Sequence, residues 1–140
     1  MAHNKKQLDR LLRVRTLQLG MVRADEARAQ DKRASEAELA HRIAQLAHGV
    51  APAPAGGNGF ALVAAAHFRS RLQQSAEMAE ARLRDAEIAA EAAAEATREA
   101  RRDQSAIEKL MARADAEAVL KAIRALEAAP PTRKIRHDPC

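Results

Sequence analysis

The stretch of sequence that decides the fold is Val50-Ala-Pro-Ala-Pro-Ala-Gly-Gly-Asn-Gly59. Its two prolines and three glycines cannot continue an α-helix, because proline lacks a backbone N–H and glycine loses much conformational freedom when it is ordered. Gly49 is placed to end a helix before this stretch, and Asn58 is placed to cap a helix after it. The stretch therefore predicts a loop over residues 49–59 between two helices.

Long runs of helix-forming residues lie on both sides of this loop. Ala, Glu, Arg, Lys and Leu dominate, which is the composition of long helices and coiled coils. We predict one helix over residues 5–48 and another over residues 60–128, before Pro130-Pro131. At the rise of an α-helix they would be roughly 65 and 100 Å long. We expect residues 130–140 to be a basic, flexible tail.

The composition predicts a thin, elongated interior. The 140 residues include no Trp and no Tyr, and the only aromatic residues are Phe60 and Phe68. Aromatic side chains normally supply large blocks of buried area, whereas alanine buries little. Disorder is the competing interpretation of a chain in which 31% of residues are charged. The strong helix formers and the periodic apolar residues favour helices instead.

Apolar residues recur along the second predicted helix with the four-and-three spacing of a coiled coil. The predicted seam consists of Ala61, Ala65, Phe68, Leu72, Ser75, Ala79, Arg82, Ala86, Ala89, Ala93, Ala96, Ala100, Asp103, Ile107, Leu110 and Ala114. The apolar residues of the first helix fall into two shorter frames. These frames are Leu8, Leu12, Leu19 and Val22, with Arg15 between them, and Leu39, Ile43, Leu46 and Val50.

A short loop makes the two helices antiparallel neighbours. The predicted fold is therefore all-α, an elongated two-helix antiparallel coiled-coil hairpin over residues 1–129, with the C-terminal helix overhanging. With Gly49 opposite Phe60, the numbers of paired residues would sum to about 110. This register would place most of the acidic row from Glu87 to Asp103 beside basic residues of the first helix.

In this register the first helix ends near Ile107, so residues 108–128 would project as an unpaired helix roughly 30 Å long. This overhang carries Leu110, Met111, Leu120 and Ile123 among lysines and arginines. An amphipathic helix presented in this way is typical of a ligand for a groove on another protein. The alternative is self-association of two such overhangs.

The net charge of +5 comes mainly from the start of the chain. There, Asp9 is the single acidic residue among Lys5, Lys6, Arg10, Arg13, Arg15 and Arg23. Such a patch suits an acidic protein surface or nucleic acid, or is simply a solvated helix face. The lack of stacking aromatics and the nearly neutral second helix argue against nucleic acid.

No arrangement of residues typical of an enzyme is found. Gly56-Gly57-Asn58-Gly59 lacks the lysine of a phosphate-binding loop, and His41 and His48 have no third metal ligand near them. We therefore expect no catalytic residue, cofactor, metal or small-molecule substrate. Cys140 stands alone, and the longest apolar run, Phe60–Ala66, is too short to span a bilayer. These features favour the cytoplasm.

Two segments together with the hairpin carry a resemblance to a known family. They are the basic opening, Lys5-Lys6-Gln-Leu-Asp-Arg-Leu-Leu-Arg-Val-Arg15, and the closing segment Gln104-Ser-Ala-Ile-Glu-Lys-Leu-Met-Ala-Arg-Ala-Asp-Ala-Glu117. In these features the chain resembles the flagellar export protein FliJ and its injectisome relatives of the YscO type. The closing segment is similar to the C-terminal helix of that family.

The resemblance implies a soluble, stalk-like component of the type III protein export apparatus, located in the cytoplasm and held peripherally at the inner membrane through that apparatus. Its partners would be the hexameric export ATPase, the cytoplasmic domain of the export gate, and export chaperones. Carried onto this sequence, the ATPase-facing residues would be Arg10, Arg13, Arg15, Ile107, Leu110, Met111, Leu120 and Ile123. The gate-facing part would lie toward Ala40–Leu46 and Phe60–Leu72, and would include Phe68 and Leu72.

Overall fold

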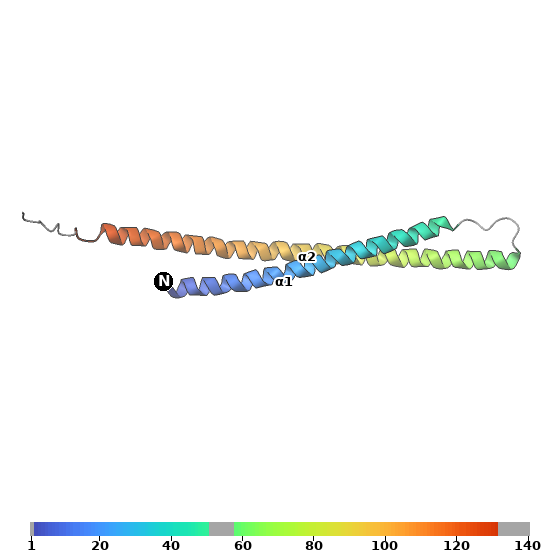
Figure 1. The fold of residues 1–140 in the computed structure, drawn as a ribbon, viewed down its shortest axis with the longest axis horizontal. Coiled ribbons are helices and arrows are strands. Elements are labelled where there is room, and N and C mark those ends of the chain that lie inside the picture. Colours follow the sequence, from blue (N-terminus) through green and yellow to red (C-terminus); the bar gives the residue numbers. More distant parts are fainter. Residues whose placement is uncertain (1, 51–57, 132–140) are drawn as a thin grey trace, which may run out of the picture.

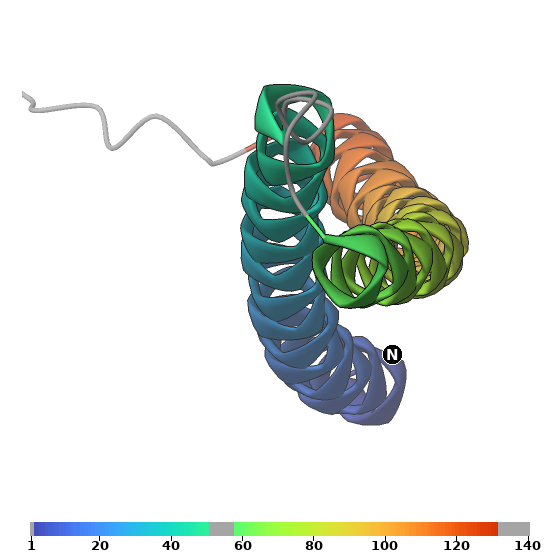
Figure 2. The same ribbon diagram turned by 90° about the vertical axis from the view of Figure 1, so that its right-hand side faces the viewer.

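The computed structural model describes residues 2–50 and 58–131 of the chain. They form two α-helices, α1 (Ala2–Gly49) and α2 (Gly59–Glu127), and no strand. The helices run antiparallel and lie side by side over most of the length of α1 (Figure 1). Figure 2, viewed from the loop end, shows a single pair of helices with no further layer. The predicted all-α antiparallel hairpin is confirmed.

The ends of α2 follow from local sequence. The Asn58 side chain accepts a hydrogen bond from the backbone N–H of Ala61 at 3.1 Å, which satisfies one of the free donors of the first turn. The helix ends at Glu127, before Pro130-Pro131. Residues 51–57 of the predicted loop and residues 132–140 of the predicted tail lie outside the described residues.

The interface between the helices is built from small side chains. Among the described residues, the buried ones are Leu19, Ala79, Ala86, Ala90, Thr97 and Ile107. No large side chain is fully buried in this part of the chain. The alanines let the two backbones approach closely, so the contact is long but thin. Stability must therefore come from many small contributions along the seam.

One of the two rows of the predicted α2 seam is confirmed. It contains the buried or half-buried residues Leu72, Ala79, Ala86, Ala93, Ala100, Ile107 and Ala114. Ala65 of the same row is half-buried but lies beyond the last described residue of α1. The second row was predicted one residue too early, since Phe68, Ser75, Arg82, Ala89, Ala96 and Leu110 are exposed. The second row that faces α1 is Ala76, Leu83, Ala90, Thr97, Gln104 and Met111. Helix α1 thus packs on the side that covers Leu83 and Met111, whereas Arg82 lies at the exposed edge of the contact, beside Glu36 of α1.

The side of α1 that faces α2 is one continuous stripe. The first predicted frame, Leu8, Leu12, Leu19 and Val22, is buried or half-buried, and Arg15 between them is also half-buried. Ile43 and Val50 continue this stripe, whereas Leu39 and Leu46 of the second frame are 40% and 61% exposed. The prediction that those two leucines belong to the seam is wrong, because the seven-residue repeat of the first frame continues unbroken.

The predicted register, in which paired residue numbers sum to about 110, is wrong by about eight to ten residues. Polar contacts join Lys5 to Asp115, Arg15 to Asp103, Thr16 to Gln104, Val22 to Thr97, and Glu36 to Arg82, so paired residue numbers sum to 118–120. The prediction assumed that α2 begins where α1 ends. Instead, α2 begins beyond the end of α1, as Figure 1 shows.

The corrected register changes what the acidic row of α2 contacts. Glu91 and Glu95 pair with Arg98 and Arg102 of the same helix, at 2.7–3.0 Å. Only Asp103 reaches α1, through Arg15. Bases located three, four or seven residues along the same helix are close enough to compete with the partner helix for these carboxylates.

The corrected register also shortens the C-terminal overhang. Helix α1 still contacts α2 at Asp115, through Lys5. The projecting part therefore begins near residue 118 rather than at residue 108, and is roughly 15 Å long. Helix α2 also projects at the loop end, where residues 59–67 have no described residue of α1 opposite them.

Candidate functional site

The C-terminal end of α2 exposes a group of large apolar side chains. Val119, Leu120, Ile123 and Leu126 are 58%, 53%, 45% and 75% exposed. Every described residue from Asp115 onward is exposed. We call these four residues the C-terminal stripe. Nothing in the described part of the chain covers it, and this end of α2 projects past the start of α1 (Figure 1).

The C-terminal stripe does not continue the seam. The seam row through Ile107 and Ala114 reaches Lys121 after one further heptad. Ile123 lies two residues later, roughly 200° around the helix from that row. Along most of α2 the apolar residues face α1, whereas those of the C-terminal stripe lie on the opposite side of the helix. An amphipathic side that points away from its own hairpin is suited to a separate partner.

The structure separates the apolar residues predicted to bind the ATPase into two groups. Leu110, Leu120 and Ile123 are about half exposed. Ile107 is only 6% exposed and Met111 is half-buried, because both belong to the seam with α1. The assignment of all five as partner-binding residues stays a prediction, but Ile107 is available to a partner only if the hairpin opens.

The basic residues of α1 also differ from one another. Arg10 and Arg13 are exposed. Arg15 donates hydrogen bonds to Asp103 Oδ2 at 3.0 Å and to Gln18 Oε1 at 3.1 Å, so it holds the two helices together. Lys5 Nζ donates to Asp115 Oδ1 at 2.9 Å, and this hydrogen bond raises the pKa of Lys5. The base of the C-terminal overhang is therefore bordered by positive charge.

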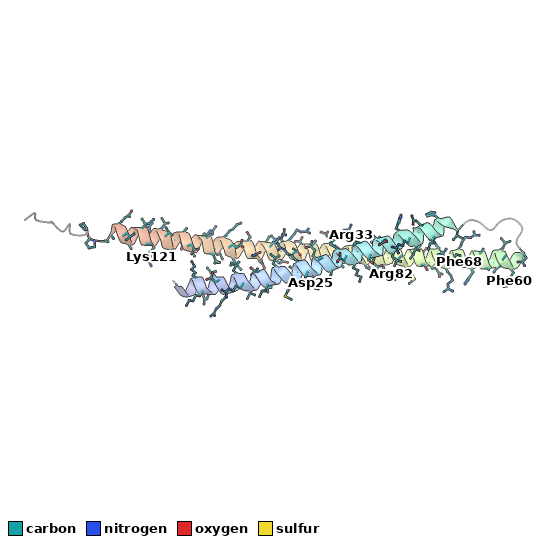
Figure 3. The ribbon with its side chains drawn as sticks, viewed as in Figure 1. Asp25, Arg33, Phe60, Phe68, Arg82 and Lys121 are labelled. Atoms are coloured by element: carbon teal, nitrogen blue, oxygen red, sulfur yellow. The ribbon has the colours of Figure 1, made fainter. Side chains whose placement is uncertain are left out.

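The loop end forms a second group of exposed apolar side chains. Phe60, Val63 and Phe68 are 83%, 69% and 56% exposed, and Figure 3 shows the two phenylalanines near the start of α2. Of the two residues predicted to face the export gate, Phe68 is exposed and Leu72 is half-buried in the seam. Phe60 and Val63 lie within the segment predicted to face the export gate, although the predicted register placed α1 beside them.

Within residues 2–50 and 58–131, no three His, Cys, Asp or Glu side chains are grouped so that they could hold a metal ion. Glu95 accepts hydrogen bonds from Arg102 and Arg98, which lower its pKa. This cluster lies on the exposed surface of α2. No described helix is both long and apolar enough to cross a membrane.

In comparisons with known proteins, no family model, no curated protein and no solved structure matches this chain. The sequence and the fold establish a two-helix antiparallel hairpin with an exposed apolar group at each end.

Proposed function

We propose that this chain is a non-catalytic docking component of a flagellar or type III protein export apparatus. In this proposal it acts as a stalk: the C-terminal end of the hairpin docks on the export ATPase ring, and the loop end faces the export gate. The chain would work in the cytoplasm and be held peripherally at the inner membrane through the apparatus. Export chaperones are further candidate partners.

The observation that carries the proposal is the C-terminal stripe. Its four large apolar side chains are about half exposed or more on a helix that projects from the hairpin. They alternate with Lys121 and Arg124, so the overhang is amphipathic. A helix of this kind gains apolar burial by entering a groove or a ring-shaped opening. The resemblance of the surrounding sequence to the FliJ family supplies the identity of the partner.

The rest of the hairpin supports this role mechanically. Helix α1 contacts α2 from Asp115 back towards the loop end, so the overhang is the end of a paired, elongated rod. Arg10 and Arg13 lie on α1 near the same end and are exposed. A ring whose inner surface is acidic would attract these arginines, and the attraction would weaken as salt is added.

Binding to a purified hexameric export ATPase tests the proposal. We expect the full chain to bind, and Leu120→Glu with Ile123→Glu to reduce the affinity at least tenfold, because charged residues would then have to enter an apolar groove. The matched control is Leu17→Glu, since Leu17 is 70% exposed on α1. Circular dichroism should show all three proteins equally helical.

Two outcomes would contradict the proposal. One is no binding of the ATPase by the unaltered chain. The other is equal binding by the chain and by the Leu120→Glu, Ile123→Glu variant, which would place the contact elsewhere on the hairpin.

A second candidate function is a structural role through self-association. Two overhangs paired antiparallel about Leu120 would place Arg113 near Glu127 and Glu117 near Arg124. Such a two-fold contact would be self-complementary in charge. Sedimentation velocity distinguishes the two functions: a monomer at micromolar concentration favours the docking function, and a dimer that the Leu120→Glu, Ile123→Glu variant abolishes favours self-association. Nucleic-acid binding by the basic start of α1 would appear instead as salt-sensitive DNA binding.

A further inference from the structure

The loop end of the hairpin has an unusual charge pattern. The chain contains 19 Asp and Glu residues, yet none lies between Glu38 and Glu77. On α2 this stretch carries Arg69 and Arg71, both exposed. On α1 the last arginine before the loop, Arg42, pairs with Glu38 of its own helix. The loop end of α2 therefore carries two arginines, and no carboxylate lies in the same stretch of sequence to neutralise them.

The apolar side chains at this end are arranged differently from those of the C-terminal stripe. Residues 60–66 are all apolar, so they surround the first two turns of α2 instead of forming one side. Phe60, Leu62 and Val63 are 83%, 51% and 69% exposed. No described residue of α1 lies opposite them in the observed register. We call residues 59–71 of α2 the tip.

The charge and the apolar residues of the tip are separated along the helix axis. The apolar turns come first, and Arg69 and Arg71 follow roughly 13–16 Å further along, measured from Phe60. A bilayer has the same order along its normal, with hydrocarbon inside and phosphate groups outside. A groove on a protein would normally contact one side of the helix, whereas hydrocarbon can surround it.

We propose that the tip docks on the surface of a bilayer that contains anionic lipids. The apolar turns enter the boundary between head groups and acyl chains, and Arg69 and Arg71 contact lipid phosphates. The lack of acidic residues from 39 to 76 matters because a carboxylate there would be repelled by the anionic surface. This inference does not depend on the proposed docking at the export ATPase, which concerns the opposite end of the hairpin. It adds a lipid contact at the loop end, which the proposed function turns towards the export gate.

A fluorescence experiment on the full chain tests this proposal. The protein has no Trp and no Tyr, so Phe60→Trp introduces one indole at the tip. Vesicles of phosphatidylcholine with about a third phosphatidylglycerol should shift its emission to shorter wavelength, as the indole leaves water. Brominated acyl chains should quench it. Ile88→Trp is the matched control, because Ile88 is 69% exposed in the middle of α2 and should show neither effect.

Vesicle co-sedimentation tests the contribution of charge. Each arginine near an anionic surface should contribute about a fivefold change in partitioning, so Arg69→Gln with Arg71→Gln should weaken binding roughly 25-fold. The control pair is Arg101→Gln with Arg113→Gln, since both arginines are exposed on α2 away from the tip. The control should bind as the unaltered chain does.

The proposal is overturned if the chain does not sediment with anionic vesicles, or if it sediments while the emission of the Phe60→Trp variant is unchanged. The second result would assign the interaction to the basic start of α1. It is also overturned if heparin or duplex DNA shifts the Phe60→Trp emission while vesicles do not, because the tip would then bind a polyanion without an apolar phase. The binding of the Leu120→Glu, Ile123→Glu variant to the ATPase tests only the proposed function, so the two proposals can fail independently.

Discussion

The two halves of the hairpin are held together by different interactions. In the half away from the loop, Leu19 and Ile107 are buried and Arg15 contacts Asp103 at 3.0 Å. Three more polar contacts cross this half. Thr97 Oγ1 donates to the backbone oxygen of Val22 at 3.4 Å, Gln104 donates to Thr16 at 3.2 Å, and Lys5 donates to Asp115 at 2.9 Å. Large side chains and hydrogen bonds thus set one register here.

In the half next to the loop, the buried residues are the alanines Ala79, Ala86 and Ala90. The interhelical ion pair of this half, Glu36 with Arg82, is long at 3.8 Å, and Glu36 Oε2 is buried without a hydrogen bond. Alanine contacts contribute little per residue and specify register weakly. We therefore expect the half away from the loop to contribute more to the stability of the hairpin than the half next to the loop.

The largest effect is expected from Ile107→Ala. Removing this buried side chain should lower the free energy of unfolding by about 2–4 kcal/mol, since it deletes most of the apolar contact at its level of the seam. Urea unfolding followed by circular dichroism measures the change. Ile88→Ala, at a site that is 69% exposed, should change it by less than about 0.5 kcal/mol. Equal effects at the two sites would show that Ile107 does not hold the seam.

The next effect concerns the half next to the loop. Ala86→Leu should destabilise the hairpin by about 1–3 kcal/mol, because Ala86 is 3% exposed and the close helix approach leaves no room for a larger side chain. Ala81→Leu, on the exposed side of the same helix, is the control and should be close to neutral. A neutral result for Ala86→Leu would mean that this half is already open in solution.

A smaller effect is expected when one interhelical ion pair from each half, Arg15–Asp103 and Glu36–Arg82, is compared directly. A double-mutant cycle with Arg15→Ala and Asp103→Ala should give a coupling of about 0.5–1 kcal/mol, which falls as salt is added. The same cycle on Glu36 and Arg82 should give a value near zero, because those groups lie 3.8 Å apart. Equal coupling in the two cycles would remove the distinction between the two halves.

The smallest effect on stability is expected from the ion pair between Lys5, in the first turns of α1, and Asp115 of α2. The hydrogen bond and charge of Asp115 raise the pKa of Lys5 above its ordinary value of about 10.4. The stabilising contribution is therefore fully present below that ordinary value and is lost as pH rises through the raised pKa. Lysine NMR titration should show that Asp115→Asn returns the pKa of Lys5 towards its ordinary value. A pKa that Asp115→Asn leaves unchanged would contradict the contact and the observed register.

Much of the fold could be predicted from local sequence. The prolines and glycines before Asn58 interrupt any helix, and the Asn58 side chain caps α2 as predicted. The seven-residue spacing through Ala79, Ala86 and Ile107 correctly identified one row of the seam. Each of these features depends on residues close together in the chain.

The candidate sites were predicted less well, and the reason is the register. Leu120 and Ile123 are exposed in either register, so their prediction as surface residues did not depend on it. Ile107 and Arg15 were assigned to a partner, but they contact the opposite helix of the hairpin. The tip lies largely within the segment predicted to face the export gate, but the extent of its exposure depends on how far α2 begins beyond the end of α1.

The sequence by itself determined that this protein is a pair of long antiparallel helices, because helix propensity, helix-breaking residues and heptad spacing are local properties. Only the tertiary structure decided how the helices align. Rows of alanines contact each other almost equally well in several registers, so the choice depends on a few larger residues such as Leu19 and Ile107. That choice decides which apolar side chains the protein buries and which it leaves exposed at its two ends.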